Sequence, residues 1–487
     1  MRIACSSRSI ALGFTLSLAC LFVSKSASAE VTLVEKDGWT FYADGRVNAF
    51  VSVGVGDGFP KSVPPPKINV GGAQEDARPT YVLYGSGAGW TVKAPTLESV
   101  DGKLLTMRTR SGFLGNIFGF GLKRKLSETT TLNAYIGMWG VVEAGARYKN
   151  GLLKSDVRQG FLSIDGPWGT VVAGRNLGLF GGISTETDFN YGHNYGLGLP
   201  CMDAGGNPAC GHVGTGVIGA GFGAGFAYAT PSIAGIKLQV GIYDPVRILG
   251  GWDRAGLPRP EGQLSWETKF GQTGFAKLAV EGIWQKLGLG ANVSQEELLK
   301  IPKRETSVWG VAGGGRVEYG PVRFGASAFH GRGLGFFTAL QNDPSMFNLV
   351  TRELRTFTGF YGQSALVFGP LQLSLGAGTA MVDQLASDRD TCSQLLCEPA
   401  RFSAAKSQTG ISAGAFYHLS ESLVVGLDYF RFTMKWHGAR NSHYRLNPDG
   451  TVATYPGAGP IIDLDPGVVK ADELSMNYLN AGATFHW

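Results

Sequence analysis

Cysteine is the residue type in this chain best suited to covalent or metal chemistry, and its spacing predicts disulfide bonds. Two of the six cysteines lie in the first 29 residues, and the other four form two close pairs. The pairs are Cys201 with Cys210 and Cys392 with Cys397. Each pair lies in a polar segment that contains glycine or serine, as expected for a loop. In an exported protein, such local pairs most simply form disulfide bonds.

The positions of the histidines predict neither a regular zinc site nor a catalytic site. His193 and His212 lie near the first cysteine pair, which leaves zinc as an alternative there, but their spacing is not that of a regular zinc site. A hydrolase would need histidine close to serine or aspartate on neighbouring elements. Five of the seven histidines fall in or beside predicted loops, namely His193, His212, His330, His437 and His443. No nucleophile elbow, HExxH motif or phosphate-binding loop is present, so we expect no enzyme, cofactor or metal.

The first 29 residues have the pattern of a cleaved signal peptide. Arg2 and Arg8 precede an apolar stretch from Ile10 to Val23, and Ala27-Ser28-Ala29 is a small-residue cleavage site. Cleavage there leaves residues 30–487 as one domain and lowers the formal net charge from +5 to +2, because three cationic side chains are removed. That charge lacks the basic excess expected of a nucleic-acid-binding protein.

The composition is typical of a membrane β-barrel. Hydrophobic residues make up 44% of the chain and charged residues 17%, compared with about 25% charged in ordinary soluble domains. Seventy-three glycines are also far above the usual share of about 7%. After the signal peptide, no run of about 18 apolar residues predicts a transmembrane helix. A closed barrel is the alternative, because closure satisfies every backbone hydrogen bond in lipid.

Sixteen segments alternate apolar and polar residues with the period of a β-strand. In the first segment Phe41 and Val47 share one face. Tyr42 and Arg46 share the other, which in a wide barrel lines water. The predicted strands are Phe41–Val55, Leu104–Leu122, Thr131–Gly145, Val157–Asp165, Thr170–Asn176, Val217–Thr230, Gly235–Tyr243, Gln263–Phe270, Phe275–Gln285, Thr306–Tyr319, Val322–Arg332, Thr356–Phe368, Leu371–Asp383, Gln408–Leu419, Leu423–Thr433 and Leu474–Trp487.

Short turns and long loops alternate between these segments. The long loops cover about 56–103, 146–156, 177–216, 244–262, 286–305, 333–355, 384–407 and 434–473. Short periplasmic turns and long extracellular loops distinguish a membrane barrel from soluble hairpins. The sequence therefore predicts an all-β, 16-stranded antiparallel transmembrane β-barrel with both termini periplasmic.

The last strand carries the most specific signal. The segment Leu479–Trp487 alternates strictly and ends in an aromatic residue. Here the chain resembles the Gram-negative general porins, which are trimeric 16-stranded outer-membrane porins whose final strand also serves as the assembly signal. Gly38–Val47 resembles the family's opening strand, and Val157–Asn176 resembles its approach to the third external loop. The chain departs from the family in ending with Trp487 rather than phenylalanine and in its long first loop.

This resemblance implies a water-filled outer-membrane channel for passive diffusion of small hydrophilic solutes and ions. The loop at about Leu177–Gly216 would fold into the barrel and narrow it. Its acidic residues would face a basic wall, and such opposed charges set ion selectivity. The expected constriction residues are Arg46, Arg108, Arg110, Arg175, Glu186 and Asp188.

Strand alternation also predicts the charge of the lumen. The inward basic residues are Arg46, Arg108, Arg110, Arg158, Arg175, Lys237, Lys269, Lys277, Arg316 and Arg323. The inward acidic residues are Asp44, Glu143, Glu267, Glu281, Glu318 and Asp428. The loop acids Glu186, Asp188 and Asp203 reduce the positive surplus from four to one, which predicts weak selectivity.

The resemblance further implies partners. These are outer-membrane lipid, the barrel-assembly machinery through the C-terminal strand ending in Trp487, and two further copies of the chain in a homotrimer. Small outward residues at Ala43, Gly45 and Ala49 would permit close packing between barrel walls.

Two alternatives stay open. One is a channel for a single solute class, such as a sugar or an anion, which a lane of stacked aromatic residues would favour. Tyr42, Tyr135 and Trp139 project inward but are scattered among small residues. The other is a barrel that acts as an adhesin or structural anchor, which the eight long loops would suit.

Overall fold

The computed structural model describes residues 30–57, 67–70, 73–76, 99–100, 103–142, 156–193, 195–200, 209–246, 252, 255–290, 301–338, 346–348, 351–387, 405–437, 442–444, 454–455, 459–460, 462–464 and 473–487. Within these ranges no helix is both long and apolar enough to cross a membrane. Several predictions fall on residues outside these ranges, namely the signal peptide at 1–29, Glu143, Cys201, Asp203, Cys392 and Cys397.

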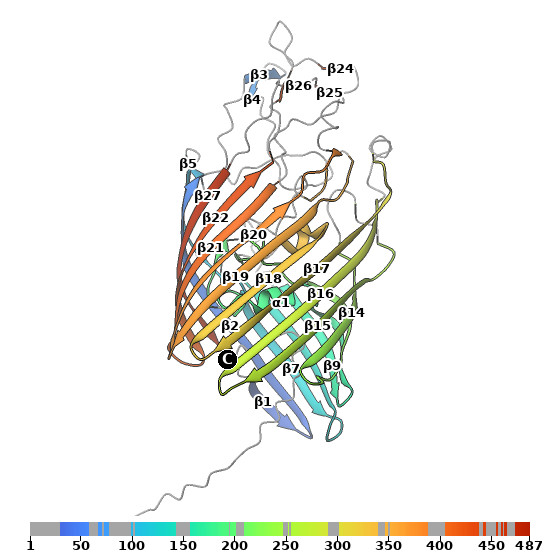
Figure 1. The fold of residues 1–487 in the computed structure, drawn as a ribbon, viewed down its shortest axis with the longest axis vertical. Helices are drawn as coiled ribbons and strands as arrows, with labels where there is room; N and C mark the ends of the chain where they lie inside the picture. Colours follow the sequence, from blue (N-terminus) through green and yellow to red (C-terminus); the bar gives the residue numbers. More distant parts are fainter. Residues whose placement is uncertain are drawn as a thin grey trace, which may run out of the picture.

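A closed antiparallel sheet of sixteen strands forms the wall of the structure (Figure 1). Its segments are β2 (Trp39–Asp57), β6 (Lys103–Arg110), β7 (Asn116–Lys125), β8 (Thr131–Gly140), β9 (Asp156–Gly166), β10 (Gly169–Leu177), β13 (Phe222–Ala229), β14 (Ile236–Tyr243), β15 (Arg259–Phe270), β16 (Gly274–Gly288), β17 (Glu305–Tyr319), β18 (Val322–Arg332), β19 (Thr356–Phe368), β20 (Leu371–Val382), β21 (Ala405–His418), β22 (Leu423–Trp436) and β27 (Glu473–His486). These seventeen segments make up the sixteen strands, because β6 and β7 are two parts of one strand that pairs with β2. The ring closes because β2 pairs with β27 on one side and with β6 and β7 on the other. The predicted fold class and strand number are confirmed.

Side chains alternate across this wall as predicted. On β2, Val47 and Val51 are exposed, whereas Asn48 and Ser52 on the opposite face are buried. Val47 is paired with Phe485 of β27, so exposed apolar residues of adjacent strands lie side by side. The outer surface is therefore apolar, as lipid requires.

The second barrel strand is interrupted, although Leu104–Leu122 was predicted as continuous. Residues 111–115 form no strand, and the register with β2 shifts by three residues between β6 and β7. Asn48 bridges the gap, since its Nδ2 donates to the Gly115 carbonyl at 2.7 Å and its Oδ1 accepts from the Gly112 amide at 2.6 Å. One side chain thus replaces the lost ladder hydrogen bonds.

Other strand boundaries also differ from the prediction. The strand expected at Val217–Thr230 begins at Phe222, because residues 217–221 belong to a loop inside the barrel. The strand expected at Thr131–Gly145 ends at Gly140. An additional strand, β1 (Val31–Lys36), pairs with β2 and extends beyond the end of the barrel where the C-terminus lies (Figure 1).

Short strand pairs decorate the loops. They are β3 (Lys67–Val70) with β4 (Ala73–Asp76), β23 (Ser442–Tyr444) with β26 (Ile462–Leu464), and β24 (Thr454–Tyr455) with β25 (Gly459–Pro460). The two-residue strand β5 (Ser99–Val100) pairs antiparallel with the start of β6. In Figure 1, β3, β4, β24, β25 and β26 lie at the end of the barrel opposite the C-terminus.

Apolar side chains fill part of the interior, which strand alternation did not predict. Inward residues of β16 to β19, such as Ile283, Val308 and Phe357, form one buried cluster with loop residues. Among the loop residues are Trp252 and, in the 3-10 helix η2 (Leu334–Thr338), Phe337. These loops fold into the barrel, so inward residues of these strands meet apolar side chains instead of water.

Candidate functional site

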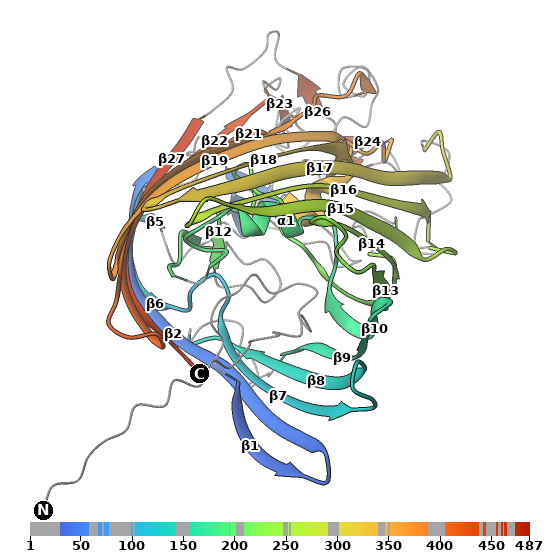
Figure 2. The same ribbon diagram turned by 60° about the horizontal axis from the view of Figure 1, so that its bottom comes forward.

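The loop between β10 and β13 covers residues 178–221, and its described parts, 178–193, 195–200 and 209–221, lie inside the barrel (Figure 2). It contains the helix α1 (Gly182–Glu186) and the strand pair β11 (Leu199–Pro200) and β12 (Ala209–Gly211). Its two limbs meet where the Gly178 amide donates to the Gly221 carbonyl at 2.7 Å. We call this segment the lumen loop.

Two buried glutamates of the wall hold the first limb of the lumen loop. Glu261 of β15 accepts hydrogen bonds from the amides of residues 179–180, at 2.7 and 3.0 Å. Glu281 of β16 accepts from the amides of Gly181 and Ile183, both at 2.7 Å. Because the first amides of a helix have no partner within it, Glu281 caps α1.

Asp428 of β22 holds the middle of the lumen loop. Its carboxylate accepts hydrogen bonds from the amides of Leu197 (3.1 Å) and Gly198 (3.2 Å) and from the hydroxyl of Tyr191 (3.2 Å). Asn480 of β27 adds a fourth hydrogen bond at 2.8 Å. These donors compensate the carboxylate for losing water, since Asp428 is only 1% exposed.

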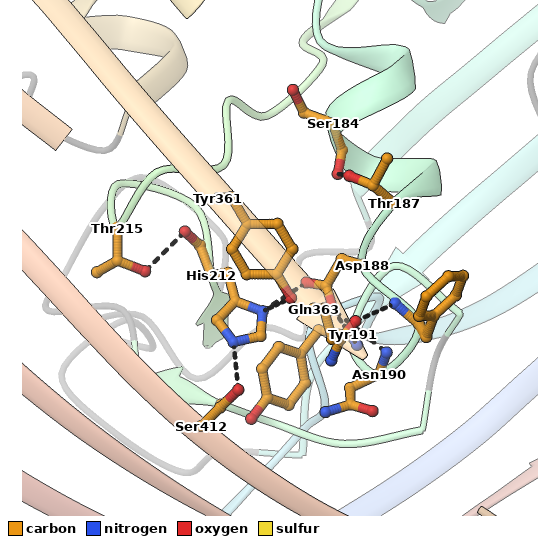
Figure 3. Close-up of polar contacts among 12 residues, drawn as sticks. Ser184, Thr187, Asp188, Asn190, Tyr191, His212, Thr215, Tyr361, Gln363 and Ser412 are labelled. Carbon is orange, nitrogen blue, oxygen red and sulfur yellow. Dashed lines mark hydrogen bonds and ion pairs between the residues drawn. The ribbon is translucent and has the colours of Figure 1, made fainter. Parts of the chain in front are cut away.

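His212 joins both limbs of the lumen loop to the wall (Figure 3). Its Nδ1 lies 2.8 Å from Asp188 Oδ2, and its Nε2 lies 2.7 Å from Ser412 Oγ on β21. The Tyr361 hydroxyl of β19 lies 3.1 Å from Nδ1. Asp188 also accepts from the amides of residues 190–191, at 3.2 and 3.1 Å. The His212 side chain is fully buried, so this network fixes the loop by contacts that exclude water.

Neutral polar side chains of β19 and β20 complete the attachment. Gln363 accepts from the Phe189 amide at 2.6 Å, and Gln372 donates to the Phe189 carbonyl at 3.2 Å. Ser374 donates to the side-chain oxygen of Asn190 at 2.6 Å. The lumen loop therefore lies against the wall from β15 to β27 and leaves the wall from β7 to β9 uncovered by these contacts.

The structure separates the two predicted loop acids from the four predicted arginines. Glu186 forms a two-oxygen ion pair with Lys277 of β16, at 2.8 and 2.7 Å. Asp188 is buried against His212. Neither acid forms an ion pair with an arginine among the described residues.

Arg46 lies on the inward face of β2, and Arg108 and Arg110 lie on the inward face of β6, which is the wall opposite the loop anchors on β15 and β16. Arg110 is buried, whereas Arg46 and Arg108 are partly exposed. Arg175 lies elsewhere. It shares a face of β10 with the exposed Val171, opposite the buried Val172, so its side chain points outward and does not line the lumen.

The tip of the lumen loop is close to cationic side chains. His193 Nε2 donates to the Glu186 carbonyl at 3.2 Å. Burial, with the charges of Arg316 on β17 and Arg323 on β18, lowers the pKa of His193 below its usual value. His193 is therefore neutral at pH 7, and Lys277, Arg316 and Arg323 carry the positive charge at this point.

The anchoring residues were the ones that sequence reasoning missed. Strand alternation placed Glu281 and Asp428 on the inward face, but it assigned them to the charge of the water-filled lumen. Glu261 was not selected, because β15 begins at Arg259 rather than at the predicted Gln263. For His212 the available signal was its place beside Cys210, which favoured a metal or disulfide context instead.

Cys210 lies in β12 and is disulfide-bonded. Its predicted partner, Cys201, and the second predicted pair lie outside the described residues. Within the described residues no group of three or more histidine, cysteine or acidic side chains is placed to hold a metal ion.

A closed barrel of sixteen strands with a loop fixed inside its lumen defines the class of transmembrane β-barrel channels. The sequence profile of the Gram-negative porins matches residues 15–435. The chain belongs to this family, and it is an outer-membrane channel for passive diffusion of solutes.

Solved structures show the same fold at low sequence identity. The outer membrane channel DcaP of Acinetobacter baumannii is 13% identical, with a TM-score of 0.55, over 94% of this chain and all of that one. An anion-selective porin from Comamonas acidovorans is also 13% identical, with a TM-score of 0.50, over 92% of this chain and all of that one. A comparison with curated protein sequences finds no significant match.

Proposed function

We propose that small hydrophilic solutes and ions cross through a water-filled passage between the lumen loop and the wall formed by β2 and β6 to β9. The supporting observation is where the loop is attached. Its described contacts run from β15 to β27 and reach Phe50 of β2 and Phe113 beyond β6, but they do not extend to β7, β8 and β9. Inward residues of β19 to β22, such as Gln363 and Asp428, are buried beneath it. Inward residues of the opposite wall, such as Arg46 and Tyr135, are partly exposed. A planar-bilayer recording tests this proposal, since the absence of single-channel conductance would contradict it.

Acidic residues that bind the lumen loop no longer count toward the net charge that we expect for the passage. Glu281 and Asp428 are almost fully buried and bind amides of the lumen loop, so they contribute little to the field in the water. Asp188 is likewise engaged by His212. With these acids removed from the balance, Arg46 and Arg108 give the passage a weak preference for anions.

Replacing Arg46 and Arg108 by alanine should raise conductance and shift the reversal potential in a salt gradient towards cations. The shift should grow as salt is diluted, because the Debye length is about 8 Å at physiological ionic strength and about 30 Å at 0.01 M. Arg175→Ala is the matched control, since this arginine points outward and should leave selectivity unchanged. An unchanged reversal potential in the double variant at low salt would show that Arg46 and Arg108 do not line the passage.

We propose that the Ser412–His212–Asp188 arrangement is structural. Its distances resemble those of a nucleophile, base and acid. Ser412, His212 and Asp188 are, however, at most 2% exposed, so a substrate has no access to the serine oxygen. Labelling of Ser412 by a fluorophosphonate probe would contradict this reading and favour an enzyme.

The proposed disulfides are Cys201–Cys210 and Cys392–Cys397. Peptide mapping of the mature protein without reductant should recover both linked pairs, because each closes a short loop in an oxidising compartment. Recovery of four free thiols, or of Cys210 linked to a cysteine other than Cys201, would contradict the pairing.

We propose a homotrimer, as in the general porins that the sequence resembles. The small residues Ala43 and Ala49 on the outward face of β2 support close contact between barrels. Gly45, which we expected to contribute, is covered by the Trp487 ring, since a Cβ on it would lie 2.6 Å from that ring. Native mass spectrometry in mild detergent should detect three copies. A strictly monomeric mass would instead favour a monomeric channel for one solute class. We further propose that residues 1–29 are removed as a signal peptide. The outer wall then contacts membrane lipid, and the barrel-assembly machinery recognises the strand that ends in Trp487.

A further inference from the structure

The wall that the lumen loop leaves uncovered carries a line of aromatic side chains. Tyr135 and Trp139 lie four residues apart on β8, on the same face as Asn133, which accepts a hydrogen bond from inward Tyr42 at 2.9 Å. Both rings are therefore inward, and both are partly exposed. At about 3.4 Å per residue their Cα atoms are roughly 14 Å apart along the strand.

Each ring has an aromatic neighbour. Tyr135 is paired in register with Phe161 of β9, and the two ring centroids lie 5.5 Å apart. The centroid of Trp139 lies 5.3 Å from that of Phe222 at the start of β13. Tyr135 also lies flat against the wall, because a Cβ on Gly119 of β7 would come within 2.1 Å of its hydroxyl oxygen. A larger residue at Gly119 would push this ring into the lumen.

Polar side chains run along the same line. The Tyr135 hydroxyl donates to Asp44 at 2.8 Å. The Arg158 guanidinium lies 5.0 Å from the centroid of Trp139, and its Nε donates to Asp156 at 2.7 Å. Between the two aromatic pairs lies Gln159, whose amide donates to Asn176 at 3.1 Å. Asp156 balances the charge of Arg158 through their ion pair.

We propose that Tyr135, Phe161, Trp139 and Arg158 form a binding track for neutral oligosaccharides. Aromatic faces pack against the apolar C–H faces of sugar rings, and carboxylate, amide and guanidinium groups bind their hydroxyls. The balanced charges favour a neutral solute over an ion. The spacing of the two aromatic pairs lets a chain of sugars, rather than one ring, contact both. The track rests on the proposed passage between the lumen loop and this wall.

The test is block of single-channel current by maltotriose in a planar bilayer, with polyethylene glycol of equal size as the control for simple obstruction. Maltotriose should interrupt the current at concentrations where polyethylene glycol does not. Trp139→Ala should weaken this block by at least tenfold, and Tyr135→Leu should weaken it similarly if the first variant fails to fold. Trp309→Ala is the matched control, because Trp309 lies on the exposed outer face of β17 and should leave the block unchanged.

The possible outcomes distinguish failure of the binding track from failure of the proposed water-filled passage. Conductance with equal block by maltotriose and polyethylene glycol, or with block that Trp139→Ala and Tyr135→Leu leave unchanged, would overturn the track while the passage stands. Conductance blocked by a ring-bearing anion such as benzoate but not by maltotriose would overturn the carbohydrate assignment. Absence of any conductance in the wild-type protein would overturn the passage itself, and the track with it.

Discussion

Replacing both Glu261 and Glu281 by glutamine should release the first limb of the lumen loop and raise single-channel conductance and current noise. Glu281 accepts one backbone amide on each oxygen, so the glutamine N–H group faces a backbone donor in either orientation. Both amides on Glu261 bond to Oε2 and Oε1 accepts from Arg259 at 2.8 Å, so the glutamine N–H group faces either those amides or the Arg259 guanidinium. A buried donor left without its acceptor costs about 1–3 kcal/mol. That loss changes the ratio of docked to undocked loop by roughly 5- to 150-fold. The barrel itself should remain folded, because its backbone ladder is untouched.

Glu267→Gln is the matched control for this prediction. Glu267 lies on β15 as Glu261 does, but it is exposed and forms no hydrogen bond to the described part of the lumen loop. We expect its glutamine variant to keep the wild-type conductance and noise. If the Glu261 and Glu281 double variant also behaved as wild type, these two carboxylates would not hold the loop.

Replacing His212 by alanine should loosen the second limb of the lumen loop. The substitution removes the side-chain partner of Asp188 Oδ2 and the contact to Ser412 on β21, while the amides of residues 190–191 still bind Asp188 Oδ1. Leaving the buried Asp188 carboxylate and Ser412 hydroxyl without this hydrogen-bond partner costs about 1–3 kcal/mol. We expect frequent transitions between conductance levels in bilayer recordings, and cleavage of the loop by added protease where the wild-type loop resists.

Two variants distinguish this role from general destabilisation. His212→Gln keeps a side-chain N–H that can donate to Asp188, and it should restore part of the wild-type behaviour. His330→Ala removes an exposed histidine of β18 that contacts only the outer side of the wall, where its Nδ1 lies 2.8 Å from Thr358 Oγ1. We expect steady current from it. Steady current and full protease resistance in His212→Ala would contradict the proposed anchoring.

The barrel was predictable because its causes are local. Side chains alternate between the two faces of a strand, as the exposed Val47 and buried Asn48 of β2 show. In a membrane barrel every strand therefore alternates apolar and polar residues, because one face meets lipid. The interruption of the second strand was not predictable in the same way. It depends on Asn48, which replaces the missing backbone partners of Gly112 and Gly115, more than 60 residues along the chain.

The candidate site was predictable only in outline. The sequence indicated a long loop after the fifth strand and inward arginines at Arg46 and Arg108, and the structure places both on the lumen side. It indicated an inward Arg175 as well, but the register of β10 turns that side chain outward. The apolar cluster around Phe357 was also missed, because its inward strand residues are buried only by loops that fold over them.

The amino-acid sequence by itself determined the exported, sixteen-stranded antiparallel barrel, its apolar exterior and its family, because each depends on patterns within a strand or a turn. Only the tertiary structure decided which inward charges face water and which hold the lumen loop. Glu281 and Ile183 are 98 residues apart, and Asp428 and Tyr191 are 237 apart. Closure of the barrel brings such pairs together. Burial then turns their carboxylates from charges of the passage into acceptors for backbone amides.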